Sequence, residues 1–205
     1  MRMTTCAFAF LMLLAGCAGK GEIVPLNVQA MPSVRSLNQN YQDLKVVVEP
    51  FEVESDAGRL GVRTHLGGGK TVFTVHGGKL GEAVAQVVAD NLKAMGFQVW
   101  VRKSGATEVP ANPDITITGQ VKQLSVEARS RFFSTKMTGK VEVAIHGLNA
   151  SDRSTVRLNL EGAREDAVFW FEPKEVQELV NRLLKENLDR LLADIRVKDR
   201  ALLTK

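Results

Sequence analysis

The stretch LGEAVAQVVADNLKAMGFQV, residues 80–99, predicts an α-helix that leads directly into a β-strand. Its apolar residues recur at helical spacing and therefore share one face. They are Leu80, Val84, Val87, Val88, Leu92 and Met95. Gly96 is placed to end the helix, because glycine readily adopts the left-handed conformation that follows a helix C-terminus. Residues 97–102 then alternate between apolar and polar, as a strand does. The fold is therefore expected to contain a helix packed on a sheet.

Short runs rich in β-branched residues flank this unit and predict further strands. They lie at residues 44–51, 60–66, 71–75, 115–126, 141–145 and 156–160. The second and third surround a glycine cluster, so residues 58–79 are predicted to form a projecting β-hairpin. Within 115–126 the alternation slips before Leu124, which indicates a β-bulge. Turn-forming residues at 149–154 predict that the last two strands pair as an antiparallel hairpin.

A second amphipathic helix is predicted to close the domain. It begins near Glu172 and Pro173, where proline suits the first turn, and continues as a leucine-rich stripe to Ile195. The expected fold class is α/β (α+β), with a single mixed, mostly antiparallel sheet, two amphipathic helices on one face and a glycine-rich β-hairpin excursion. We expect the domain to span residues 44–197, with residues 198–205 as a C-terminal tail.

The beginning of the chain has the pattern of a secretory signal. Residues 6–16 (CAFAFLMLLAG) are apolar and follow the single basic residue Arg2. As a helix they would span roughly 16 Å, which is too short for a bilayer core of about 30 Å. The run ends in Leu14-Ala15-Gly16-Cys17, which resembles the lipobox of bacterial lipoproteins. That resemblance implies that residues 1–16 are a signal peptide, and that Cys17 receives a diacylglycerol thioether and becomes the acylated N-terminus.

Lipidation would define where the protein sits. Two or more acyl chains give stable membrane anchoring. Cleavage before Cys17 also removes Cys6 and leaves one cysteine, so no disulfide is predicted. In Gram-negative lipoproteins, an aspartate after the cysteine favours retention in the inner membrane. That position is Ala18 here, so by analogy we expect the periplasmic face of the outer membrane, with the inner membrane as the alternative.

The segment between the lipobox and the domain is predicted to be a tether. Residues 17–43 contain two prolines and no sustained period, which favours a lipidated N-terminus followed by an extended linker. Ile23, Val24 and Leu26 are the residues in it that can pack on the domain. Removing Arg2 from the 27 basic residues leaves 26 against 23 acidic ones, a net charge of +3. This charge is too small to indicate nucleic-acid binding.

The loop HLGGGKT, residues 65–71, ends as phosphate-binding P-loops do. A P-loop requires G-x-x-x-x-G-K-[ST] followed by a helix whose N-terminus faces the phosphates. The required first glycine is Thr64 here, and residues 71–75 predict a strand instead of a helix. We therefore expect no nucleotide binding. The loop is interpreted as the tip of the hairpin and as a candidate contact element.

The remaining residue patterns do not predict an enzyme. His65, His76 and His146 form no H-x-x-x-H or H-E-x-x-H pattern, so neither a metal site nor a cofactor is expected. An alternative is that His65 and His76 face each other across the hairpin. There is no G-x-S-x-G, and the acidic residues of the closing helix alternate with basic ones as on a solvated face. A hydrolase with a dispersed site is kept as an outside alternative.

Two aromatic clusters are candidate binding surfaces. Phe132 and Phe133 follow two arginines in RSRFF, between two predicted strands. The run at 169–171 (FWF) places three aromatic residues in a row, so at least one should face away from a one-sided core. Exposed aromatic residues are typical of interfaces. Phe132, Phe133 and Trp170 are therefore candidate interface residues. The alternative is that the second helix or the N-terminal segment covers them.

Several segments together carry a family resemblance. They are the lipobox, VVVEPF at 46–51, the glycine-rich stretch, residues 80–99 and PDITITGQV at 113–121. In this order they resemble the YajG-like bacterial lipoproteins. More distantly, the chain is similar to the auxiliary lipoproteins of ABC-type lipid-transport systems and to lipoproteins that activate cell-wall synthases. The resemblance covers residues 44–195 and brings no catalytic motif, so only the role of Cys17 is carried over.

The leading hypothesis from the sequence is a lipid-anchored, periplasmic, non-enzymatic module that binds or scaffolds an envelope protein partner. The alternative is an auxiliary subunit of an ABC-type envelope lipid-transport system, in which the chain would oligomerise, for example into a ring.

Overall fold

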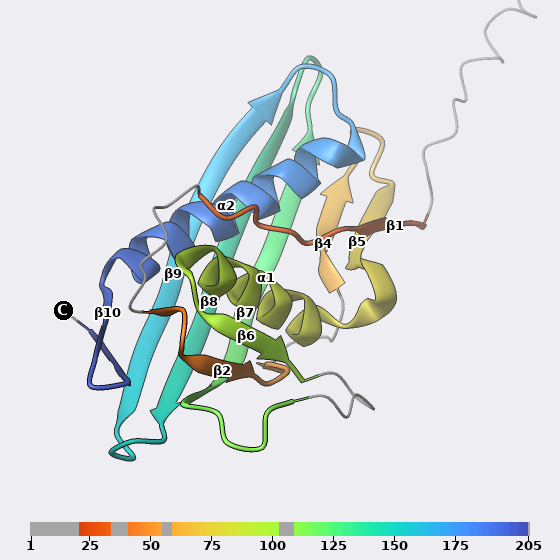
Figure 1. Ribbon diagram of the computed structural model, residues 1–205. Coiled ribbons are helices and arrows are strands. Elements are labelled where there is room, and N and C mark those ends of the chain that lie inside the picture. The colour runs from red at the N-terminus through yellow and green to blue at the C-terminus, as the bar shows by residue number, and fades with distance from the viewer. Residues whose placement is uncertain (1–20, 34–40, 55–58, 103–108, 205) are drawn as a thin grey trace, which may run out of the picture.

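The computed structural model describes residues 21–33, 41–54, 59–102 and 109–204. Within these residues, nine strands form one sheet, two helices lie on one face of it, and a small hairpin follows the second helix (Figure 1). The predicted fold class, an α+β domain with a single mixed sheet, is confirmed.

The elements follow the predicted order, and several strands are longer than predicted. The strands of the sheet are β1 (Glu22–Leu26), β2 (Lys45–Val48), β3 (Glu52–Val53), β4 (Arg59–Thr64), β5 (Lys70–Val75), β6 (Gln98–Val101), β7 (Ile115–Ser130), β8 (Thr135–Asn149) and β9 (Thr155–Val168). The other elements are a 3-10 turn (His76–Gly78), the helices α1 (Leu80–Met95) and α2 (Pro173–Ala193), and the hairpin strands β10 (Ile195–Lys198) and β11 (Ala201–Thr204).

Strand β7 organises the sheet. One edge of β7 pairs antiparallel with β8 over its whole length, and β8 pairs antiparallel with β9. The other edge pairs in parallel with β2, β3 and β4, one after another. The pairing register of β7 with β8 shifts between Val121 and Gln123, which confirms the predicted bulge. The β4–β5 hairpin is also confirmed, but it lies inside the sheet between β7 and β1 and does not project from it.

The helices cover one face of the sheet and leave the other open to solvent. Helix α1 packs against β2 and β6, and α2 packs against β8 and β9. Along β8, Met137 and Val141 are buried under the helices, whereas Lys140 and His146 point to the open side and are exposed. Gly96 ends α1 with a φ of 110°, and its N–H donates to the carbonyl of Leu92, as predicted for a left-handed C-terminal residue.

The prediction of a linker over residues 17–43 is wrong for the residues from Glu22 to Ser33. Strand β1 pairs in parallel with β5, and the chain then runs along α2 (Figure 1). Every second residue is buried, namely Leu26, Val28 and Ala30. Residues 17–20 and 34–40 of the predicted linker lie outside the described residues.

Helix α2 supplies the polar partners of this N-terminal segment. The N–H of Asn27 donates to Gln177 and that of Gln29 donates to Asn181, each at 2.9 Å. Further along, the hydroxyl of Ser33 donates to Asp189 at 2.5 Å. The three helix residues are spaced so that they share one side of α2. The segment is therefore fastened to the domain through its backbone.

The C-terminal residues are not a tail, which corrects the predicted boundary at residue 197. Strands β10 and β11 pair antiparallel, and Ala201 and Leu202 are buried. The side chain of Asn149, at the end of β8, receives the N–H of Leu202 at 2.8 Å and donates to its carbonyl at 2.9 Å. Asn149 thus pairs with β11 as a neighbouring strand would.

Asp114 provides a second attachment for this hairpin. It accepts hydrogen bonds from the guanidinium of Arg200 at 2.8 Å and from the N–H of Lys45 at 2.9 Å. Desolvation acts to raise the pKa of Asp114, but these two donors outweigh it, so the pKa is lowered from its usual value.

Replacing Asp114→Asn should therefore lower the free energy of unfolding by about 1–2 kcal/mol at pH 7. A carboxylate whose folded-state pKa is lowered adds stability only above its unfolded-state pKa of about 3.9, and that stability is lost as the pH falls through the folded-state value. Urea unfolding at neutral and acidic pH measures this. The difference between wild type and variant should shrink in acid, and a difference that does not change with pH would contradict the assignment.

Candidate interaction surface

Three turns that are far apart in the sequence meet at one end of the sheet. Strand β4 runs parallel to β7 as far as the end of β7, and β8 begins beside the end of β9. The tip of the β4–β5 hairpin, the β7–β8 turn and the connection from β9 to α2 are therefore neighbours, and they lie in the upper part of the view in Figure 1. We call this surface the aromatic end, and it comprises residues 65–69, 131–134 and 169–172.

Four large aromatic side chains at the aromatic end are exposed to solvent. The exposed fractions are 82% for Phe132, 78% for Phe133, 76% for Phe169 and 77% for Trp170. Together they expose on the order of 600 Å², which is as large as the largest apolar patch of a typical soluble monomer. Three of them, Phe132, Phe169 and Trp170, line a depression of about 560 Å³.

The candidates Phe132, Phe133 and Trp170 are thus exposed neighbours, and Phe169, the first residue of the FWF run, joins them. Among the described residues, neither α2 nor the N-terminal segment covers these side chains, so that alternative is not supported.

A cation–aromatic stack forms the base of the aromatic end. Phe171 turns inward, with its ring 6.3 Å from that of Phe73 in β5. The guanidinium of Arg63 lies 3.9 Å from the centre of the Phe171 ring, and its Nε donates to Ser130 at 3.0 Å. Desolvation lowers the pKa of Arg63, and Glu22 opposes this shift. The stack joins β4, β5 and β7 to the connection between β9 and α2, so the exposed aromatic residues stand on a braced platform.

The hairpin tip is also tied to the start of β1. The Nε2 of His65 lies 2.8 Å from the hydroxyl oxygen of Thr71, and that hydroxyl donates to Glu22 at 3.3 Å. Desolvation, together with the nearby positive charge of Arg63, lowers the pKa of His65 and so favours the neutral ring. The N–H of Gly21 donates to the carbonyl of Lys70 at 3.2 Å. The N-terminal end of β1 therefore lies beside the aromatic end.

The three histidines lie far apart in the structure. His65 and His76 lie at opposite ends of β5, and His146 is on the open face of β8, so a pair facing across the hairpin is not formed. Among the described residues, no group of three or more His, Cys, Asp or Glu residues is arranged to hold a metal ion. Strand β5 follows the glycine-rich tip directly, as predicted, so this loop does not lead into a helix as a P-loop would.

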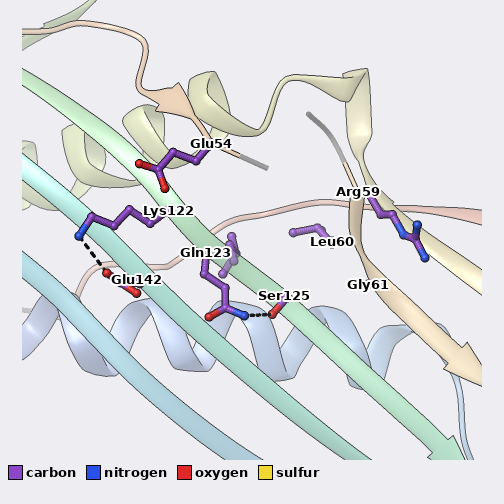
Figure 2. A pocket seen from close by; sticks show the side chains of 9 residues that line it. Glu54, Arg59, Leu60, Gly61, Lys122, Gln123, Ser125 and Glu142 are labelled. Carbon is purple, nitrogen blue, oxygen red and sulfur yellow. Dashed lines mark hydrogen bonds and ion pairs between the residues drawn. The ribbon is translucent and has the colours of Figure 1, made fainter. Parts of the chain in front are cut away.

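A second depression, of about 580 Å³, lies where the bulge of β7 faces β4 (Figure 2). Leu60 is buried beneath a polar rim in which Lys122 pairs with Glu142 at 2.9 Å. The hydrogen bond from Lys122 to Glu142 raises the pKa of the lysine, which stays charged at pH 7. This rim adjoins residues 55–58, which are outside the described residues. The aromatic end is therefore the better-defined candidate surface.

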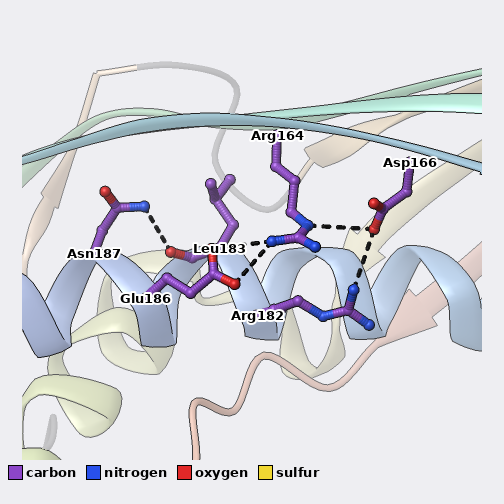
Figure 3. A network of polar contacts seen from close by, with 6 residues as sticks. All are labelled: Arg164, Asp166, Arg182, Leu183, Glu186 and Asn187. Carbon is purple, nitrogen blue, oxygen red and sulfur yellow. Dashed lines mark hydrogen bonds and ion pairs between the residues drawn. The ribbon is translucent and has the colours of Figure 1, made fainter.

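A polar network fastens α2 to the edge strand β9 (Figure 3). Arg164 of β9 donates to Glu186 of α2 at 2.8 Å and lies 3.4 Å from Asp166. Arg182 of α2 lies 3.5 Å from the same Asp166. Desolvation acts to lower the pKa of Arg164, but Asp166 and Glu186 outweigh it and raise the pKa. The charges of this network pair with each other across β9 and α2, which indicates a structural role.

A family model described as an uncharacterized lipoprotein matches residues 62–199 of the chain. The chain belongs to this lipoprotein family. The matched region runs from β4 to the C-terminal hairpin and includes the whole aromatic end.

Membership indicates attachment of the lipoprotein to a membrane through a lipid, while the family description states no role. No helix in the described part of the lipoprotein has the length and apolar character needed to cross a membrane. The finer likeness to YajG-like lipoproteins stays a prediction.

Solved structures with a similar arrangement differ widely from this lipoprotein in sequence. Protein XCC0632 from Xanthomonas campestris has 14% identity and a TM-score of 0.48, over 83% of this chain and 92% of that chain. Lipoprotein GNA1162 from Neisseria meningitidis has 8% identity and a TM-score of 0.35, over 71% of this chain and 99% of that chain. These similarities support no functional conclusion. A search of curated proteins found no match.

Proposed function

We propose that this lipoprotein is a non-enzymatic module, anchored through a lipid on Cys17 to the periplasmic face of the outer membrane, that binds or scaffolds an envelope component. Its family supports the lipid anchor. The lipobox-like residues Leu14–Cys17 supply the attachment site, and Ala18 favours the outer membrane. The contact surface in this proposal is the aromatic end.

The observation that carries the binding role is the exposure of four aromatic side chains on a braced platform. Aromatic residues dominate the energetics of protein contacts, because they bury a large area at a small cost in side-chain entropy. Here the Arg63–Phe171 stack and the Arg63–Ser130 hydrogen bond hold the supporting strands in place. The surface is therefore organised before it meets a partner, which lowers the entropic cost of binding.

Site-specific photocrosslinking in cells tests this assignment. A photoreactive phenylalanine at position 133 should form an adduct with an envelope component. The matched control is the same residue in place of Leu148, which is half exposed on the open face of β8, far from the aromatic end. We expect adducts from position 133 and none from position 148. No adduct from position 133, or equal adducts from both positions, would contradict the proposed surface.

The identity of the crosslinked component distinguishes the proposed binding or scaffolding role from the alternative role as an auxiliary subunit of an ABC-type transport system. Recovery of a permease or substrate-binding component of an ABC-type system would favour the auxiliary transport role. An adduct with a second copy of the chain would favour a ring-forming oligomer.

A further inference from the structure

We propose that the aromatic end docks on the same lipid surface that holds the anchor, with Phe132, Phe133, Phe169 and Trp170 in the headgroup region. The domain then stands upright on the membrane. This inference rests on the proposed function in that Cys17 carries the lipid, and it names the membrane itself as the envelope component that the aromatic end contacts.

The length of chain before β1 supplies the first step. Gly21 is hydrogen-bonded to Lys70 beside the hairpin tip, and Glu22 pairs with Thr71. Only residues 18–20 separate Gly21 from Cys17, so even a fully extended chain spans at most about 14 Å between them. A lipidated Cys17 lies at the membrane surface. The start of β1 is therefore held within about 14 Å of the lipid.

The sheet then determines which end of the domain meets the membrane. Pairing through β5 and β4 aligns Glu22 with Ala128, near the end of β7. Neighbouring strands lie about 4.8 Å apart, and three spacings separate β1 from β7 and four separate it from β8, which places the β7–β8 turn about 14–19 Å to the side of β1. The β7–β8 turn also lies a few residues beyond Ala128 along the strand direction, a distance on the order of 10 Å. A tether of this length therefore brings the aromatic end to the lipid surface.

The opposite end of the domain cannot contact the lipid surface in place of the aromatic end. Strand β7 has 16 residues and is roughly 50 Å long, so its start at Ile115 lies far from Gly21. The N-terminal segment cannot detach from the domain to lengthen the tether, because the N–H groups of Asn27 and Gln29 are hydrogen-bonded to side chains of α2. The short tether therefore fixes the orientation as well as the distance.

The chemistry of the aromatic end suits a lipid interface. Tryptophan is enriched where proteins meet the headgroup region, and exposed phenylalanine inserts at the boundary between headgroups and acyl chains. Arg129 at the end of β7 and Arg131 in the β7–β8 turn precede the two phenylalanines, and Lys70 begins β5 directly after the hairpin tip; all three are exposed. Cationic side chains are attracted to anionic headgroups. Because the anchor keeps lipid next to the aromatic end, the effective concentration of lipid at this surface is high.

The two tryptophans of the chain provide a built-in test. Trp170 is at the aromatic end. Trp100 is in β6 and aligns through Val47 with Thr116 of β7. Along β7, the positions Thr116 and Ala128 are roughly 40 Å apart. Docking should therefore bring Trp170 to the lipid and keep Trp100 away from it.

The experiment uses the full lipidated protein in vesicles that contain anionic phospholipid and phospholipid brominated near the top of the acyl chains. Trp100→Phe leaves Trp170 as the fluorophore, and Trp170→Phe leaves Trp100 as the matched control. Bromine should lower Trp170 emission about twofold or more and change Trp100 emission by less than about a tenth. Unchanged Trp170 emission, or equal quenching of both, would overturn the docking and leave a protein as the occupant of the aromatic end.

A third variant links the quenching to the aromatic surface. In the Trp100→Phe background, Phe132→Ser with Phe133→Ser should reduce the quenching of Trp170 about twofold, with the lipid anchor intact. Unaltered quenching would overturn the role of these side chains. The mass of the N-terminal peptide is measured in each sample. A chain without lipid on Cys17 overturns the proposed function and the docking together, whereas a lipidated chain with unquenched Trp170 overturns the docking alone.

Discussion

A Cys17→Ser variant is expected to disappear from the outer-membrane fraction as a mature protein. The thioether to diacylglycerol forms on the thiol, and a serine hydroxyl does not replace it. Each buried methylene contributes about 0.8 kcal/mol to membrane attachment, so the loss of two or more acyl chains removes stable anchoring. The variant should accumulate as an unprocessed precursor or as a soluble chain. Cell fractionation followed by immunoblotting measures both the location and the size of the product.

Cys6→Ser is the matched control, because Cys6 lies in the predicted signal peptide and is removed with it. That variant should fractionate as wild type does. If the Cys17→Ser protein still appears in the outer membrane at mature size, lipidation at Cys17 is wrong.

The second large effect concerns stability, and it is expected for Asn149→Ala. Asn149 is fully buried, and its side chain makes hydrogen bonds to both backbone groups of Leu202 and to the hydroxyl of Ser154. The substitution leaves the N–H and the carbonyl of buried Leu202 without these partners. Each such group costs about 1–3 kcal/mol, so the free energy of unfolding should fall by about 2–5 kcal/mol. Urea denaturation followed by circular dichroism measures the change.

Asn159→Ala is the control for this prediction, because Asn159 is exposed on the open face of β9. Surface substitutions of this kind usually change stability by less than about 0.5 kcal/mol. An Asn149→Ala variant as stable as the control would contradict the role assigned to Asn149 in holding the C-terminal hairpin.

The elements that were predicted correctly are those with strong local patterns. Helix α1, its end at Gly96 and the strand that follows lie where the periodicity of residues 80–99 places them. The slip of alternation before Leu124 corresponds to a real bulge. These features depend on side-chain spacing within one segment, which the sequence displays directly.

The errors lie where a segment depends on distant partners. Residues 22–33 lack a sustained period, and their backbone is satisfied by side chains of α2 about 150 residues away in sequence, such as Gln177. The C-terminal hairpin likewise depends on Asn149, which has the composition of a turn former and gives no sign of a buried role. Such pairings are set by tertiary packing, so local propensity does not reveal them.

The sequence predicts the parts of the candidate surface separately. Composition alone indicates the glycine loop at 65–71, the RSRFF run and Trp170. Their convergence depends on the order of strands in the sheet, in which β4 joins β7 and β9 ends beside the start of β8. Phe169 was not identified because three consecutive aromatic residues do not reveal which of them turn inward, and here it is Phe171 that packs on Phe73.

The most direct test of a lipid-anchored role is mass spectrometry of the N-terminal peptide of the mature protein isolated from membranes. We predict a peptide that begins at Cys17 and carries a diacylglycerol thioether and an acylated amine. A mature chain that begins at another residue, keeps residues 1–16 or has an unmodified Cys17 would contradict it.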